Sequence, residues 1–176
     1  MISLERKIVG VHTMLSGATV PHAFGGALAL AFYTGEPRGT RDIDVNIFLP
    51  VSALDVVRSA LAKRIVINDA QAADAVANDQ FRVFWEDTPI DVFFNVAEFH
   101  NDVMQGVEHH KFAKLIIPIL GADHLTVFKA MYNRTKDWAD IEAMLEADSI
   151  DKTRVIGWLV RLLGVDNPRT RKFISY

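Results

Sequence analysis

The sequence predicts an α+β protein with a mixed sheet flanked by helices, followed by a C-terminal helical subdomain. Apolar and polar residues alternate in segments such as Asp42–Pro50, which is the two-residue period of a strand. Segments with apolar residues three or four apart lie between these strands and indicate helices. From Asp123 onward the pattern is helical throughout. We therefore expect an α/β core over residues 1–120 and a helical subdomain over residues 121–176.

Four helices and three strands are expected in the first half of the chain. The apolar spacing predicts helices over residues 3–17, 27–35, 52–64 and 72–79. Strands are predicted over residues 19–26, 42–50 and 65–69. Ser52 is the expected N-cap of its helix, because a serine hydroxyl accepts a hydrogen bond from a free backbone N–H of the first turn.

The second half begins with a hairpin and ends with helices. Strands are predicted over residues 80–87 and 89–96, with Glu86–Pro89 as the connection. A helix over residues 97–107 and one or two strands over residues 109–120 follow. The C-terminal helices are predicted over residues 123–134, 136–147 and 151–164, with Asp123 and Asp151 as N-caps.

The composition indicates a folded protein without cysteine chemistry. Half of the 176 residues are hydrophobic and 23% are charged, which is enough apolar mass for a core. Disulfides and thiolate zinc sites are excluded because the chain has no cysteine, which fits a cytoplasmic location. Ile8–Gly35 carries no Asp, Glu, Lys or Arg, but its longest apolar run, Ala23–Tyr33, is shorter than the ~20 residues of a spanning helix. We therefore expect no membrane association.

The net charge of −3 is unevenly distributed. Residues 152–176 carry six basic side chains against one acidic one, Asp166. A basic surface of this kind suits a polyanionic partner, and a solvated tail explains it equally well.

Two aspartates one residue apart are the first candidates for chemistry. Asp42 and Asp44 share one face of their predicted strand, where both carboxylates can reach a Mg²⁺ ion. The alternative is the solvent face of an ordinary edge strand. Asp91 lies in an otherwise apolar strand, where an unpaired acid is rare, and a third carboxylate would allow a second ion. Its alternative is a carboxylate at a hairpin edge.

A glycine pair precedes these aspartates. Gly25 and Gly26 lie at a predicted strand-to-helix turn, where the absence of side chains lets a phosphate approach the backbone N–H groups. A plain turn is the commoner explanation of such a pair. The combination of glycine pair, helix, Asp-x-Asp strand and later Asp is more specific than any part of it.

This combination resembles a known superfamily. The glycine pair followed by "RGTRDIDV" resembles the DNA polymerase β-type nucleotidyltransferases, and implies their mixed sheet flanked by helices. The segment "DHLTVFKAMYNRTKDWADIEAML" is similar to the AbiEii-type toxins of abortive-infection and toxin–antitoxin systems, whose mycobacterial relatives modify tRNA. The resemblance covers roughly residues 20–148.

The resemblance implies roles for individual residues. Gly25 and Gly26 would contact the phosphates of a nucleoside triphosphate. Asp42, Asp44 and Asp91 would hold Mg²⁺, with Mn²⁺ as the alternative ion. Lys129 would match the helix lysine that contacts the triphosphate, and Asp140 the late aspartate of the family.

Simpler explanations exist for several of these residues. Lys129 has the sequence context of a lysine that extends from an apolar helix face to solvent. Asp137 and Asp140 are also explained by surface ion pairs with neighbouring basic side chains on the helix. Arg38 and Thr40 either contact a phosphate or brace the strand.

Other conspicuous residues have no assigned chemistry. Adjacent strand residues point to opposite faces, so His109–His110 is not interpreted as a metal pair. The tryptophans are expected in the core and are Trp85, Trp138 and Trp158.

The leading hypothesis is Mg²⁺-dependent transfer of a nucleotide from an NTP to a tRNA 3′ end. It implies a toxin with a cognate antitoxin, and the basic stretch after Arg154 as an RNA surface. A second hypothesis is nucleotidylation of a small molecule, such as an aminoglycoside, or of a protein hydroxyl. A third is a non-catalytic nucleotide- or RNA-binding module.

Overall fold

The computed structural model describes residues 2–35 and 39–176, whose strands form one mixed six-stranded sheet. The strands are β1 (His22–Phe24), β2 (Ile43–Ile47), β3 (Gln80–Trp85), β4 (Thr88–Phe94), β5 (Glu108–Phe112) and β6 (Leu115–Ile119). Their order is β3-β4-β2-β1-β6-β5. The β2–β4 and β1–β6 pairs are parallel, and the other neighbouring pairs are antiparallel. The predicted α+β class is confirmed.

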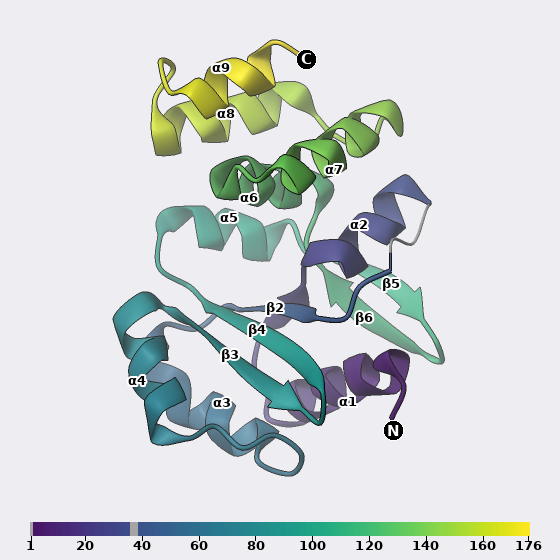
Figure 1. Ribbon diagram of the computed structural model, residues 1–176, viewed down its shortest axis with the longest axis vertical. Helices are drawn as coiled ribbons and strands as arrows, with labels where there is room; N and C mark the ends of the chain where they lie inside the picture. Colours follow the sequence, from purple (N-terminus) through teal and green to yellow (C-terminus); the bar gives the residue numbers. More distant parts are fainter. Residues whose placement is uncertain (1, 36–38) are drawn as a thin grey trace.

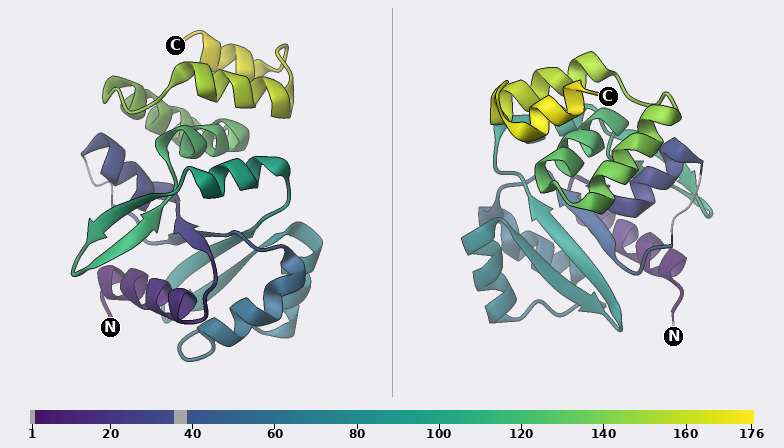
Figure 2. Two further views of the ribbon diagram at one scale, coloured as in Figure 1. Left: turned by 180° about the vertical axis from the view of Figure 1, so that it is seen from behind. Right: turned by 45° about the horizontal axis from the view of Figure 1, so that its top comes forward.

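Helices cover both faces of this sheet. They are α1 (Leu4–Gly17), α2 (Gly26–Thr34), a 3₁₀ turn η1 (Val51–Ala53), α3 (Leu54–Leu61), α4 (Asp69–Asn78), α5 (Glu98–Gln105), α6 (Ala122–Tyr132), α7 (Thr135–Glu146), α8 (Lys152–Leu163) and α9 (Pro168–Ile174). Figure 1 shows α1, α3 and α4 on one side of the sheet and α2, α5, α6 and α7 on the other. In Figures 1 and 2, α8 and α9 stack on α6 and α7, away from the sheet. Within the two described ranges, no helix is long and apolar enough to cross a bilayer.

Three sequence predictions about elements were wrong, and one helix was missed. Residues 65–69 do not form a strand, because Ile65 and Ile67 anchor a loop that pairs with no strand in the described residues. Ser52 lies within η1 and does not cap α3. Asp123 lies in the first turn of α6, whose N-cap is Gly121. The short helix α9, which begins at Pro168, was not predicted.

Most of the other predicted elements are present with small shifts of their ends. The hairpin connecting β3 and β4 turns at Glu86–Asp87, and residues 109–120 form two strands. The side chain of Asp151 caps α8 by accepting from the N–H groups of Thr153 and Arg154. Trp85 and Trp138 are buried and Trp158 packs against the core, as predicted.

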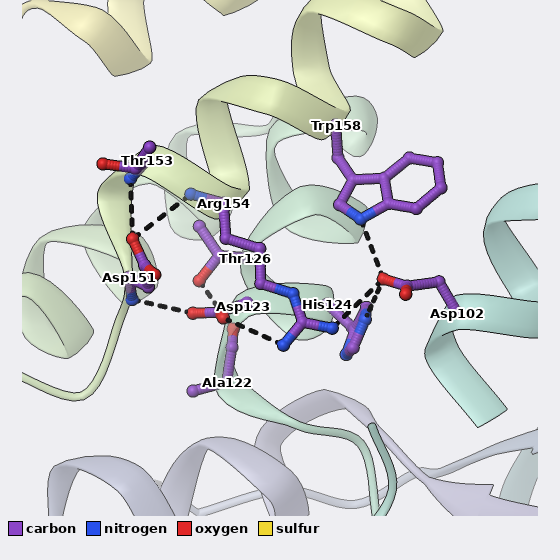
Figure 3. Close-up of polar contacts among 9 residues, drawn as sticks. All are labelled: Asp102, Ala122, Asp123, His124, Thr126, Asp151, Thr153, Arg154 and Trp158. Atoms are coloured by element: carbon purple, nitrogen blue, oxygen red, sulfur yellow. Dashed lines mark hydrogen bonds and ion pairs between the residues drawn. The ribbon is translucent and has the colours of Figure 1, made fainter. Parts of the chain in front are cut away.

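A polar network joins α5 to the C-terminal helices (Figure 3). One carboxylate oxygen of Asp102, on α5, accepts hydrogen bonds from His124 Nε2 at 2.9 Å, Trp158 Nε1 at 2.8 Å and Arg154 Nη2 at 3.2 Å. Burial would raise the pKa of Asp102, but these three donors outweigh it and keep the pKa below its ordinary value. The network therefore fixes α6 and α8 relative to the sheet-bound helix α5.

Candidate functional site

A cavity of about 550 Å³ lies between the sheet and the helices α5, α6 and α7. Most of the site residues predicted from the sequence line it: Gly26, Thr40, Asp42, Asp44, Asp91, Lys129 and Asp140. Gly25 precedes Gly26 in the sequence and is the N-cap of α2. Arg38 lies outside the described residues. Segments far apart in the sequence thus meet at one cavity.

The sheet register brings two of the predicted carboxylates together. β2 and β4 run parallel with Asp44 directly beside Asp91, and Asp42 immediately precedes β2. The alternating residues Ile43 and Val45 point to the opposite face and are buried in the core. The period-two pattern therefore places the aspartates on the cavity side.

Asp91 is engaged by an arginine that the sequence analysis did not single out. Arg82 on β3 lies beside Asp91 in the register and donates to both of its carboxylate oxygens, from Nε at 2.6 Å and Nη2 at 2.7 Å. Such a two-point contact is the strong form of an arginine–carboxylate pair. The alternation of "QFRVFW" contained the signal, because it puts Arg82 on the polar face of a strand that forms a hairpin with the Asp91 strand.

Asp44 is held in an unfavourable environment for a negative charge. Burial, and then the neighbouring charges of Asp42 and Asp91, raise its pKa to about 6. Lys129 and Lys136 oppose these effects but do not cancel them. The negative charge of Asp44 is therefore only partly balanced by the neighbouring lysines.

Gly26 is required by close contact with this carboxylate. The N–H of Gly25 donates to the carbonyl oxygen of Asp44 at 3.0 Å. Gly26 has φ +55°, and a Cβ added to it would lie 1.8 Å from Asp44 Oδ2. Only glycine meets both conditions, since other residues rarely adopt this φ and none has room for its side chain. The N-terminus of α2 is thereby brought against the carboxylates.

Lys129 is a buried residue and not an exposed surface lysine. It is 6% exposed, and its Nζ donates to Asp140 Oδ2 on α7 at 2.7 Å. Asp137 is also buried, but it pairs with Arg134 and closes the capping box at the start of α7. Lys129 and Asp140 thus form a charged pair in the cavity wall, whereas Asp137 is explained by helix capping.

Thr40 braces the first aspartate. Its hydroxyl donates to Asp42 Oδ1 at 2.5 Å and lies 3.3 Å from the carbonyl oxygen of the same residue. The contact holds the Asp42 side chain at the entrance to β2.

The carboxylates of the cavity determine which cation could bind there. Within the described residues, no three His, Asp or Glu side chains converge as a metal-binding group. Asp42 and Asp44 alone fit Mg²⁺, which commonly binds proteins through one or two carboxylates together with substrate phosphates. The oxygens of Asp91 are engaged by Arg82, so its predicted role as a metal ligand stays a prediction.

The basic side chains after residue 151 make contacts within the protein. Arg154 contacts Asp102, Arg171 pairs with Asp166, and Arg169 donates to the carbonyl oxygen of Met131. Lys172 and Arg161 lie over Trp138 and Trp158, and Lys152 donates to the carbonyl oxygen of Tyr176. None of these six basic residues, all of them described, lines the cavity.

Comparison with known proteins gives structural relatives only. No family model matches the sequence, and no curated protein does. The solution structure of the antibiotic-resistance factor ANT(2″)-Ia has a TM-score of 0.63 at 16% identity, over 97% of this chain and 91% of its own. The crystal structure of ANT(2″)-Ia in complex with adenylyl-2″-tobramycin has a TM-score of 0.63 at 14% identity, over 97% of both chains. The lincosamide antibiotic adenylyltransferase LnuA, lincomycin-bound, has a TM-score of 0.57 at 16% identity, over 81% of this chain and 97% of its own.

The chain has the fold of these adenylyltransferases. The Megavirus polyadenylate synthase is also similar, with a TM-score of 0.51 at 11% identity, over 93% of this chain and 38% of its own. The nucleotidyltransferase-type fold implied by the sequence resemblance is therefore confirmed. At these identities the similarity establishes only the fold, and the AbiEii-type assignment stays a prediction.

Proposed function

We propose that this protein transfers a nucleotide from an NTP to a hydroxyl acceptor with the help of Mg²⁺. The observation that carries the proposal is the meeting of Asp42, Asp44 and the Gly25–Gly26 turn at one cavity of a nucleotidyltransferase-type fold. The glycine turn opens the helix N-terminus to phosphate, and the carboxylates supply the ligands of a hard cation. Bound there, Mg²⁺ would neutralise charge on the phosphates.

The residues of the chain then have distinct tasks. Lys129, held by Asp140, offers a positive charge to the triphosphate. An acceptor oxygen bonds to the α-phosphorus as the bond to the pyrophosphate oxygen breaks. The hydroxyl proton passes to the carboxylate of Asp91, whose position is set by Arg82. Positioning and charge stabilisation supply most of the rate in reactions of this type.

The acceptor predicted from the sequence is a tRNA 3′ end, in a toxin with a cognate antitoxin. The internal contacts of the six basic residues after residue 151 do not favour an RNA surface there. A small-molecule hydroxyl is the second candidate, favoured by the apolar and aromatic side chains of β4 and α6 that line the cavity.

Transfer of label from NTPs tests the proposal. The protein is incubated with each α-³²P-labelled NTP, Mg²⁺ and either total tRNA or a pool of small hydroxyl compounds. We expect labelled product that is lost in Asp42→Ala, and the labelled fraction identifies the acceptor class. Absence of labelled product with every NTP and acceptor, including the protein itself, contradicts the enzyme and leaves the binding module.

A further inference from the structure

The order of the strands assigns a direction to the proposed reaction, and the inference that follows rests on the proposed function. The attacking oxygen and the leaving pyrophosphate lie on opposite sides of the transferred phosphorus. The glycine turn that would hold the departing phosphates follows β1, on one side of β2. On the other side of β2 lie β4 and β3, with Asp91 and Arg82. The acceptor therefore enters over β4 and β3.

The part of the cavity over β4 and β3 combines apolar and aromatic side chains with the polar residues of the two strands. Its lining from β4 and the segment after it includes Phe93 and Val96, and α6 contributes Phe128, Met131 and Tyr132. Val96 is 55% exposed and Tyr132 is 47% exposed, which is unusual for large apolar side chains grouped around one cavity. Concave sites with this lining bind the apolar body of a small molecule.

The charged residues around this part of the cavity largely neutralise one another. Arg82 pairs with Asp91, and Arg134 pairs with Asp137. Asp79 adds a carboxylate at the rim. With Asp42 and Asp44 assigned to the proposed cation, this balance does not match a polyanion such as RNA, and the one remaining rim carboxylate is little for a polycation.

His100 supplies a directed polar group within this apolar lining. It extends from α5, is partly buried and lines the cavity, with its ring 5.6 Å from that of Phe128. Its Nδ1 is sealed from solvent and has no hydrogen-bond partner among the described residues. Nε2 is therefore the ring nitrogen that a ligand in the cavity can reach.

The protonation of this ring follows from its surroundings. Burial lowers the pKa of His100, and Asp79 opposes this only in part, so the ring is neutral at pH 7. A buried N–H without an acceptor costs more than a buried lone pair, so the single proton belongs on Nε2. His100 thus offers one N–H donor to the cavity.

We propose that the space between β3–β4, α5 and α6 is the acceptor site, and that it takes a small uncharged hydroxyl compound with a flat apolar body. Phe93, Phe128 and Tyr132 contact the body of the acceptor. His100 Nε2–H donates to an oxygen or nitrogen of the acceptor and determines which compounds are accepted. The acceptor hydroxyl then lies toward Asp91.

Binding of phenyl β-D-glucopyranoside, a neutral probe of this class, tests the inference without requiring turnover. Saturation-transfer NMR titrations compare the unmodified protein with His100→Asn and His100→Gln. Glutamine places an N–H near the position of Nε2 and asparagine does not, so we expect the Kd to rise about fivefold in His100→Asn and to stay near the original value in His100→Gln. His109→Asn, which changes an exposed histidine outside the cavity, is the matched control.

The outcomes separate this inference from the proposed function. No saturable binding of the probe, an equal Kd in both His100 variants, or displacement of the probe by total tRNA at micromolar concentration overturns the acceptor site. Binding of Mg²⁺ with α,β-methylene-ATP and the corresponding GTP, CTP and UTP analogues is titrated in parallel. Failure of every nucleotide to bind contradicts the proposed function, whereas a change of nucleotide preference in His100→Asn assigns this space to the nucleobase and overturns the inference.

Discussion

Asp44 is an acid whose ionised form is unfavourable to the ligand-free fold. Its pKa of about 6 results first from burial and then from Asp42 and Asp91, while an unfolded chain ionises with an ordinary Asp pKa. At neutral pH the unfolded state is therefore favoured by this residue. Stability is commonly given up at functional sites in this way.

Asp44→Asn is expected to separate stability from activity. The amide removes the buried charge, so the free energy of unfolding in metal-free buffer at pH 7 should rise by about 2 kcal/mol. Nucleotide transfer should fall at least about a hundredfold, because the residue that we propose as a cation ligand is lost. Urea unfolding and the labelled-NTP assay measure the two effects. The exposed Asp74→Asn is the control, and a loss of stability in Asp44→Asn would contradict the argument.

Gly26→Ala is expected to damage the same site from the other side. The new Cβ would meet Asp44 Oδ2 at 1.8 Å and Cγ at 2.6 Å, and φ +55° adds about 1 kcal/mol of strain. We expect an unfolding free energy lower by about 2–3 kcal/mol and loss of transfer. Gly17→Ala has open space around its Cβ at the end of α1 and should lower neither quantity. Equal behaviour of the two variants would show that Gly26 does not support the carboxylate.

At the scale of elements, β1 depends on a buried histidine. His22 Nδ1 donates to the carbonyl oxygen of Val20 at 2.8 Å, and its Nε2 lies 3.0 Å from His12 Nδ1 on α1. Burial lowers the pKa of His22 to about 4, with a smaller contribution from His12. The neutral ring is therefore part of the contact between β1 and α1.

This contact predicts a loss of stability in mild acid. Well above pH 6.5 His22 is neutral in both states, and as the pH falls toward 4 the unfolded chain binds the proton first. Between pH 7 and pH 5 this residue should lower the free energy of unfolding by about 2 kcal/mol. Urea titrations at the two pH values measure the difference, which His22→Asn should reduce. An undiminished difference in His22→Asn would assign the acid sensitivity to other groups.

The local pattern of apolar residues was sufficient to predict most helices and strands. It failed where contacts with distant segments decide which structure forms. The alternation in "DIDVNIFLP" predicted β2 and the face of its aspartates, because the core needs Ile43 and Val45 on one side. Residues 65–69 have a similar apolar pattern, but no strand edge in the described residues accepts them. Lys7 lies on the apolar face of α1. It can be buried there because its Nζ donates hydrogen bonds to Asp87 and Thr88, which are far away in the sequence.

The sequence predicted the main carboxylates of the candidate site but not the residues that surround them. Asp91 was found because an acid in an apolar strand is conspicuous, and Asp42 and Asp44 were found because a glycine pair and Asp91 accompany them. Arg82 and His100 are ordinary residues in the sequence. They gain a role only when β3 is paired with β4 and α5 is placed over the cavity. Long-range pairing of this kind has no local signal.

At the scale of the whole molecule, the cavity is shared between the sheet and the C-terminal helices. The sequence predicts units at residues 1–120 and 121–176, yet Lys129 and Asp140 of the second unit face Asp44 of the first. The Asp102 network joins the same two parts through α5, α6 and α8 (Figure 3). We therefore expect these parts to unfold together.

The tryptophans allow this cooperativity to be measured. In Trp85→Phe the remaining fluorophores, Trp138 and Trp158, lie in α7 and α8, so fluorescence reports the C-terminal helices while far-UV circular dichroism reports the whole chain. The two urea midpoints should coincide. Asp102→Ala should lower both together, by about 1 M urea for a loss of about 2 kcal/mol, because His124 and Arg154 lose a shared acceptor.

An exposed ion pair provides the control for this last prediction. Asp166 and Arg171 lie in the same helical part, and the side chain of Asp166 is 84% exposed, so Asp166→Ala should shift the midpoints by less than about 0.3 M. Two separate transitions, with only the fluorescence midpoint moved by Asp102→Ala, would mean that the helices fold independently of the sheet. In that case the cavity would be assembled by docking of two stable units, and Lys129 would be positioned by their interface alone.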